Sequence, residues 1–211
     1  MARRQRQLCL SVRSCCGIER IYVHEDVYDN FVEKFVEVTK TYKLGNPLDK
    51  ETNLGPMVKT SASDYVRAQI KEAVNKGAKS LVDESLFPQS KKGTPYLSPH
   101  VLVDVDHTMA VMKDESFGPV VGIMKVSNDE EAIKLMNDSE YGLTASIWSS
   151  SIEQAKKLSR KIETGTVFLN KCDYLDPGLA WTGVKNTGRG VSLSAYVYDS
   201  VTRLKSINFR L

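Results

Sequence analysis

The chain has 211 residues, of which 41% are hydrophobic and 26% charged, so it can bury a core as one large domain or two small ones. Its longest apolar runs are far shorter than the roughly 20 residues of a membrane helix, which excludes a bilayer-spanning helix. The formal net charge is only +3, and the excess of basic over acidic residues lies in the first 13 residues. The body of the chain therefore lacks the concentrated positive charge that nucleic-acid-binding surfaces require.

The first 13 residues form a basic segment that differs from the rest of the chain. They include Arg3, Arg4, Arg6 and Arg13 and no acidic residue. Because chain termini are usually disordered unless they are tied down, we expect residues 1–13 to be a disordered tail. An organellar presequence and a nucleic-acid-binding arm are the alternatives. We therefore expect a cytoplasmic protein, or a mitochondrial one if the segment is a presequence.

The cysteines do not have the spacing of a metal site. The chain contains Cys9, Cys15, Cys16 and Cys172, with no Cys-x-x-Cys pair and with three histidines at irregular distances. We therefore predict no metal site. Adjacent cysteines join only as a strained vicinal disulfide, and no secretory signal with an apolar core precedes this pair. We expect free thiols in a reducing compartment.

The residues from Gly17 onward alternate between short β-rich runs and amphipathic helical patterns. A strand is predicted over residues 18–23, followed by a helix over 27–42 with Asp26 as its N-cap. The next predicted helix covers 59–75, with Tyr65, Ile70 and Val74 among its apolar positions and Gly77 as its stop. Further predicted elements are strands at 80–83, 100–105 and 120–126, a helix at 129–137, a strand at 144–148, a helix at 152–162 and a strand at 166–169. This alternation predicts an α/β fold with a largely parallel sheet and flanking helices.

Residues 173–211 have a different pattern. Residues 173–194 read as a glycine-rich loop, and Val201 to Phe209 alternate between apolar and polar side chains. This alternation predicts a C-terminal β-strand arm. The strand has no obvious partner in its own chain, so it is suited to pairing with another chain in a homo- or hetero-oligomer.

Two glycine-rich patterns are near matches to phosphate-binding loops. Residues 183–190 have the four-residue gap of a P-loop, but Arg189 and Gly190 stand where Lys and Ser or Thr are needed. Gly188 and Gly190 also begin a dinucleotide fingerprint, but Leu193 occupies the position of the third glycine and no strand leads into it. We therefore predict no phosphate loop in this segment.

Several short motifs occur together along the chain. They are Ser14-Cys15-Cys16-Gly17, Asn46-Pro47-Leu48 with Leu54-Gly55-Pro56-Met57, Glu115-Ser116-Phe117-Gly118-Pro119-Val120, Tyr141-Gly142-Leu143-Thr144-Ala145-Ser146, Gly165-Thr166-Val167 to Asn170, and Lys185-Asn186-Thr187-Gly188-Arg189-Gly190. In this order and at these intervals, the chain from Ser14 to about Phe209 resembles the aldehyde dehydrogenase superfamily. The resemblance covers the catalytic domain and oligomerisation arm, less than half of a full-length member. It implies a catalytic domain over 14–195 and an oligomerisation strand over 196–211.

The resemblance also implies a nucleophile. In this family a cysteine thiolate attacks an aldehyde, hydride passes to NAD or NADP, and a glutamate-activated water hydrolyses the thioester. The family motif places the nucleophile at Cys15 and leaves Cys16 as a packed neighbour. Val12 and Arg13 depart from the motif, because they stand where the family has Gly and Gln. Without the resemblance, such a thiol would be read as a small buried hydrophobe.

Cofactor and substrate contacts follow from the same resemblance. Glu115 and Phe117 match the residues that hold the nicotinamide ribose and ring, although a glutamate before a Gly-Pro turn is otherwise a solvated loop acid. The residues matched to the substrate side are Asn170, Asp173, Tyr174 and Trp181, for which loop packing is the alternative role.

The family's dinucleotide-binding domain, cofactor-holding lysine and general base precede the nucleophile in relatives. We therefore expect that the 211 residues alone neither bind the cofactor NAD or NADP nor turn over an aldehyde. One alternative is a non-catalytic interaction protein that assembles with full-length family members. Another is a residual cofactor-free thiol esterase at Cys15, because acyl transfer to a thiol needs no hydride acceptor.

Overall fold

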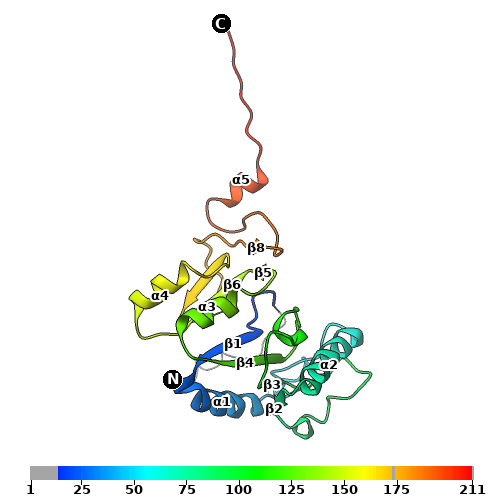
Figure 1. The fold of residues 1–211 in the computed structure, drawn as a ribbon. Helices are drawn as coiled ribbons and strands as arrows, with labels where there is room; N and C mark the ends of the chain where they lie inside the picture. Colours follow the sequence, from blue (N-terminus) through cyan, green and yellow to red (C-terminus); the bar gives the residue numbers. More distant parts are fainter. Residues whose placement is uncertain (1–13, 173, 211) are drawn as a thin grey trace. The chain divides into compact units, whose positions relative to one another are not determined.

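The computed structural model describes residues 14–172 and 174–210, and their elements are drawn in Figure 1. The chain forms two compact units, of which the first ends at Ser139 and the second begins at Glu140. The predictions made for residues 1–13, including the basic tail, lie outside the described residues.

A four-stranded sheet organises the first unit. In spatial order its strands are β1 (Arg20–His24), β4 (Val120–Val126), β3 (His100–Val103) and β2 (Lys79–Ser80). β4 runs parallel to both β1 and β3, whereas β2 is an antiparallel edge strand. The predicted α/β fold with a largely parallel sheet is therefore confirmed.

Two helices of the first unit cover opposite faces of this sheet. They are α1 (Glu25–Lys40, blue in Figure 1) and α2 (Thr60–Asn75, blue-green). Val101 of β3 lies in the same buried cluster as Phe35 of α1, and the next residue, Leu102, lies in the same cluster as Val66 of α2. Successive side chains of a strand point to opposite faces, so the sheet separates the two clusters. The third helix, α3 (Asp129–Asn137), packs on β1 and β4.

Local features of α1 and α2 correct two sequence predictions. His24, and not Asp26, caps α1, because its Nδ1 accepts the Asp26 N–H at 3.3 Å. Asp26 lies in the first turn, where its charge favours the helix dipole. α2 ends before Gly77 as predicted, but Tyr65 and Val74 are about half exposed. The buried face of α2 is instead formed by Ser63, Val66, Gln69, Ile70 and Ala73.

The second unit is built on a strand–helix–strand segment. β6 (Thr144–Ile147) and β7 (Thr166–Leu169) run parallel, and α4 (Ile152–Ser159) connects them. A short antiparallel pair, β5 (Tyr141–Gly142) and β8 (Val184–Lys185), was not predicted. Short 3-10 turns occur in the first unit at Glu84–Leu86 and Ala110–Met112.

The C-terminal segment differs from the strand predicted from Val201. Val201 is the last residue of a short helix, α5 (Val197–Val201), and residues 202–210 have no regular secondary structure. The alternating pattern therefore did not set the conformation at Val201. The side chains of Leu204, Ile207 and Phe209 are exposed. Pairing of this segment with another chain stays a prediction.

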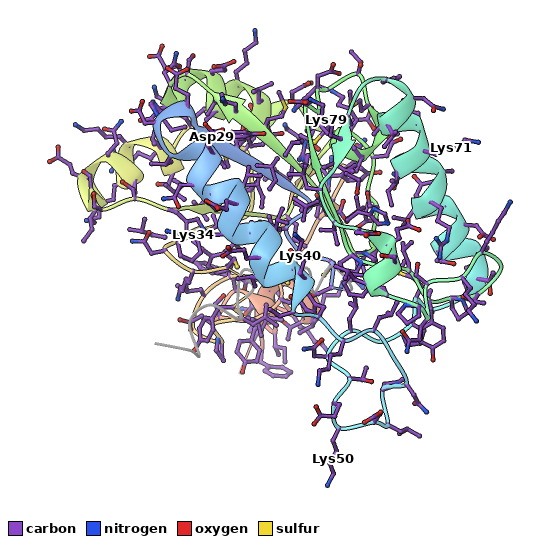
Figure 2. All side chains as sticks on the ribbon, turned by 90° about the horizontal axis from the view of Figure 1, so that it is seen from below. Asp29, Lys34, Lys40, Lys50, Lys71 and Lys79 are labelled. Carbon is purple, nitrogen blue, oxygen red and sulfur yellow. The ribbon has the colours of Figure 1, made fainter. Side chains whose placement is uncertain are left out.

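The outer faces of α1 and α2 carry both signs of charge. Figure 2 shows Asp29, Lys34 and Lys40 along α1 and Lys71 on α2, and all four are exposed. A mixture of this kind is typical of a solvated helix face. Within the described part of the chain, no helix combines the length and the apolar character needed to cross a membrane.

Candidate active site

Cys15 is an exposed thiol in the turn that precedes β1. The Gly17 N–H closes this turn by donating to the Ser14 carbonyl at 2.9 Å. Cys16 is buried, and its Sγ lies 3.1 Å from the Ser14 Oγ. The two adjacent thiols thus have different environments. Cys16 is a packed neighbour, and Cys15 is the one that a solute can reach.

Glu19 joins this segment to the loop that carries the predicted cofactor residues. Its Oε2 accepts the Ser116 N–H at 3.0 Å, and its Oε1 accepts the Phe117 N–H at 2.8 Å. Both oxygens of the carboxylate are therefore engaged by backbone donors. The structure brings the segment of Cys15 and the loop of Glu115 and Phe117 into one hydrogen-bonded arrangement.

The Glu19 carboxyl group is perturbed by its surroundings. Burial raises its pKa above the usual range, and the neighbouring charge of Glu115 acts in the same direction. The hydrogen bonds from Ser116 and Phe117 and the charge of Arg20 lower it, but burial has the larger effect. Sequence reasoning missed Glu19. An acidic residue within the strand predicted over residues 18–23 was the only signal available.

The loop after residue 114 presents two side chains outward. Ser116 is buried, and its Oγ has no hydrogen-bond partner among the described residues. On either side of it, Glu115 is exposed and the Phe117 ring is 40% exposed. A Cβ added at Gly118 would lie 2.8 Å from Val66 Cγ2, so the loop packs closely on α2.

Glu115 and Phe117 are exposed, so both side chains are free to contact the nicotinamide end of NAD or NADP, the group that the resemblance implies. An exposed aromatic ring offers a face for a planar ring, and an exposed carboxylate accepts hydrogen bonds from sugar hydroxyls. The residues present therefore fit the group that the resemblance implies. Within residues 14–172 and 174–210, no three His, Cys, Asp or Glu side chains are grouped so as to hold a metal ion.

In the second unit, the Asn170 side chain bonds the backbone of a neighbouring loop. It follows β7 with a φ of 53°. Its Oδ1 accepts the Ser149 N–H and its Nδ2 donates to the Ser149 carbonyl, both at 2.9 Å. Both ends of the amide group therefore bond the backbone between β6 and α4. The contacts of Asn170 in this structure are those of a loop-positioning residue.

The other predicted substrate residues have different surroundings. Tyr174 is about half exposed, and Lys171 Nζ lies 4.5 Å from the centre of its ring. Trp181 exchanges two backbone hydrogen bonds with Ser192, at 2.7 and 2.9 Å. Asp173 lies outside the described residues.

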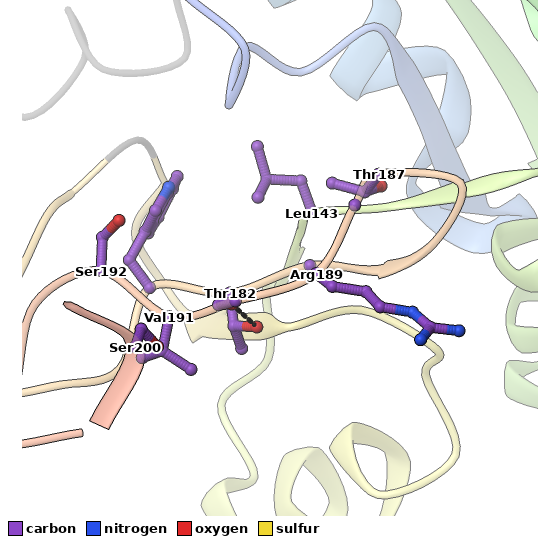
Figure 3. A pocket seen from close by; sticks show the side chains of 11 residues that line it. Leu143, Thr182, Thr187, Arg189, Val191, Ser192 and Ser200 are labelled. Carbon is purple, nitrogen blue, oxygen red and sulfur yellow. Dashed lines mark hydrogen bonds between the residues drawn. The ribbon is translucent and has the colours of Figure 1, made fainter. Parts of the chain in front are cut away.

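Trp181 also lines a pocket of about 450 Å³ within the second unit (Figure 3). The glycine-rich segment 187–192 forms much of its wall, and Thr182 Oγ1 holds that segment by donating to the Gly190 carbonyl at 2.9 Å. The Arg189 side chain extends away from Ser192 in Figure 3. Asn170 and Tyr174 are not among the residues that line this pocket.

The chain matches a family of known proteins over most of its length. The model described as "Aldehyde dehydrogenase family" matches residues 7–207. A 3-sulfolactaldehyde dehydrogenase from Priestia aryabhattai is 33% identical over 198 residues, which are 93% of this chain and 40% of that protein. The chain thus spans about two-fifths of the length of this curated relative.

Solved structures give the same result. A glyceraldehyde-3-phosphate dehydrogenase from Methanocaldococcus jannaschii, complexed with NADP, superimposes with a TM-score of 0.87 at 28% identity, covering 97% of this chain and 43% of that one. A betaine aldehyde dehydrogenase from Staphylococcus aureus in complex with NAD+ has a TM-score of 0.82 at 29% identity, covering 90% of this chain and 38% of that one.

Proposed function

Since this chain belongs to the aldehyde dehydrogenase family, we propose that Cys15 is the nucleophile of an aldehyde-oxidising site, with Glu115 and Phe117 on its nicotinamide side. The observation that carries this proposal is the link through Glu19. That residue ties the segment of the exposed thiol to the loop of the two cofactor residues.

The chemistry of this chain begins at the Cys15 sulfur. Its thiolate attacks the aldehyde carbon, so a C–S bond forms and the carbonyl π electrons move to the oxygen. We assign the Cys15 backbone N–H as one donor to that oxygen. The Phe117 ring and the Glu115 carboxylate would hold and orient the nicotinamide end of the cofactor. When bound, NAD or NADP supplies the hydride acceptor.

We further propose that the 211 residues by themselves do not turn over an aldehyde. The relatives they match are more than twice as long. The proposed site consists of a nucleophile and one side of a cofactor site. This portion is then expected to retain acyl transfer to Cys15, because that step needs no hydride acceptor.

Two assays on the purified chain test the proposal. Nicotinamide reduction with short aliphatic, aromatic and semialdehyde substrates should stay at background. p-Nitrophenyl acetate should release a burst of p-nitrophenolate that is stoichiometric with protein and absent in Cys15→Ala. Cys16→Ala is the matched control and should retain the burst. Cys15-dependent nicotinamide reduction would contradict the expected lack of turnover, and an equal burst in Cys15→Ala would contradict the nucleophile.

A second candidate function is non-catalytic assembly with full-length family members through Val201–Phe209. The observation that favours it is the row of exposed apolar side chains at Leu204, Ile207 and Phe209. Exposed apolar surface of this kind marks sites that bind another chain.

A further inference from the structure

We propose that Glu19 is a positioning residue that fixes the backbone of Ser116 and Phe117 and thereby sets the direction of the Glu115 and Phe117 side chains. The inference rests on the proposed function of those two residues as cofactor contacts. Glu19 itself is proposed to touch neither cofactor nor substrate.

The carboxylate bridges two consecutive amide groups. Each oxygen accepts one N–H, from Ser116 at 3.0 Å and from Phe117 at 2.8 Å. Because both N–H groups bond one planar carboxylate, the position and the orientation of the peptide between Ser116 and Phe117 are fixed. Hydrogen bonds to an ionised acceptor are also stronger than neutral ones.

The backbone at Phe117 needs such support. Its φ is 49°, in the left-handed region that a bulky residue rarely occupies. A conformation of this kind persists only where surrounding contacts hold it in place. The bond from the Phe117 N–H to Glu19 is a contact of this type, made at the strained residue itself.

Buried and exposed side chains alternate along this loop, so the backbone conformation decides where the cofactor residues point. Ser116 points inward and is buried, whereas Glu115 and Phe117 on either side of it are exposed. A rotation of the peptide between Ser116 and Phe117 would therefore move both exposed side chains. Fixing that peptide keeps the ring and the carboxylate on the outer side.

Glu19 has a rigid base from which to act. Its carbonyl accepts the Gly122 N–H of β4 at 3.3 Å, and β1 begins at the next residue. The backbone of Glu19 is thus part of the sheet, while Cys15 lies four residues before it. Glu19 therefore holds the loop of Glu115 and Phe117 at a fixed place relative to the sheet. Because Cys15 precedes the same strand, the loop also keeps a fixed place relative to the nucleophile.

Amide NMR of the 211-residue chain tests this inference directly. The Ser116 and Phe117 amide protons should shift together as Glu19 ionises, with a midpoint above the usual glutamate range because burial raises the Glu19 pKa. Glu19→Gln should abolish the titration, because a side-chain amide does not ionise. The amide also offers one acceptor oxygen in place of two, so one of the two N–H groups loses its partner. Exchange of at least one of the two amides should become roughly tenfold faster.

A matched control uses a carboxylate elsewhere in the first unit. Glu131 Oε2 accepts the Ser127 N–H at 2.8 Å, so Glu131→Gln should affect the Ser127 amide and leave Ser116 and Phe117 unchanged. Iodoacetamide labelling of Cys15 and the exchange of β4 amides should be unchanged in Glu19→Gln. A general loss of structure would alter both.

The outcomes separate this inference from the proposed function. Amides of Ser116 and Phe117 that do not titrate in the wild-type chain would overturn the role of Glu19, whether or not the variant folds. A titration that persists in Glu19→Gln would do the same. Absence of the Cys15-dependent ester burst, with the titration intact, would instead overturn the proposed function.

Discussion

Asp138 accepts hydrogen bonds from two side chains of the first unit. Lys113 Nζ lies 2.7 Å from its Oδ1 and His107 Nδ1 lies 2.6 Å from its Oδ2, while His107 Nε2 lies 2.9 Å from the Tyr22 hydroxyl. The bonds from Lys113 and then His107 lower the pKa of Asp138 to about 2. This network ties β1 to the end of α3.

The lowered pKa predicts a pH dependence of stability. A carboxyl whose folded pKa lies below its unfolded value stabilises the fold above the unfolded pKa, and loses this effect as pH falls through the folded pKa. Asp138→Asn should therefore cost about 1 kcal/mol at neutral pH, after allowance for solvent screening of a half-exposed group. The cost should shrink between pH of about 4 and 2.

Urea unfolding of wild type and Asp138→Asn across this pH range measures the effect. Asp64→Asn, at an exposed position of α2, is the control and should change the free energy of unfolding little at any pH. A cost for Asp138→Asn that stays constant from neutral pH to pH of about 2 would contradict the assigned pKa.

The sequence offered candidate site residues through family motifs, but it gave no sign of the tertiary contacts around them. Cys15, Glu115 and Phe117 were predicted from short motifs, and Glu19, four residues after Cys15, bonds the backbone of Ser116 and Phe117. Glu19 was missed because its partners lie almost one hundred positions along the chain. Asn170 was assigned to the substrate side, but the sequence carried no sign that Ser149 would occupy both ends of its amide.

Among the helices and strands, the spacing of apolar residues predicted the longer elements well. Residues 120–126 and 129–137 form β4 and α3 with the predicted bounds. β5 and β8 were missed because two-residue strands have no periodicity of their own and exist through pairing with each other. The predicted terminal strand does not form in the described structure, because alternation supplies no pairing partner: Val201 ends a short helix, and residues 202–210 have no regular secondary structure.

Gly165 illustrates a constraint on the packing of the second unit. A Cβ at this position would lie 1.7 Å from the Thr182 carbonyl oxygen, which is far inside contact distance. Gly165→Ala should therefore destabilise the second unit by about 2–3 kcal/mol, because backbone must move to admit the methyl group.

Hydrogen exchange of the β7 amides Thr166 and Phe168, whose N–H groups face β6, measures this effect, and it should become at least tenfold faster at this destabilisation. Gly178→Ala in the same unit is the control. Its added Cβ would meet only the Asp176 side chain, at 3.3 Å, so exchange in β7 should be unchanged. Equal exchange in Gly165→Ala and wild type would show that the close approach of Thr182 does not constrain this site.

A substitution in the segment 202–210 tests whether the chain assembles with full-length family members. Leu204 is fully exposed, so Leu204→Asp should weaken co-elution of the chain with a full-length family member by about tenfold or more if the segment binds it. The matched control is Leu48→Asp, because Leu48 is also an exposed leucine but lies in the first unit. Equal retention of both variants would argue against binding through this segment.

The exposed thiol of Cys15, in the turn before β1, is the proposed nucleophile of this protein. The most direct measurement is peptide mass spectrometry of the chain after brief reaction with p-nitrophenyl acetate, to locate the acetyl group. We expect acetylation at Cys15 and none at the buried Cys16. An acetyl group on Cys16, or distributed over lysines with Cys15 unmodified, would contradict it.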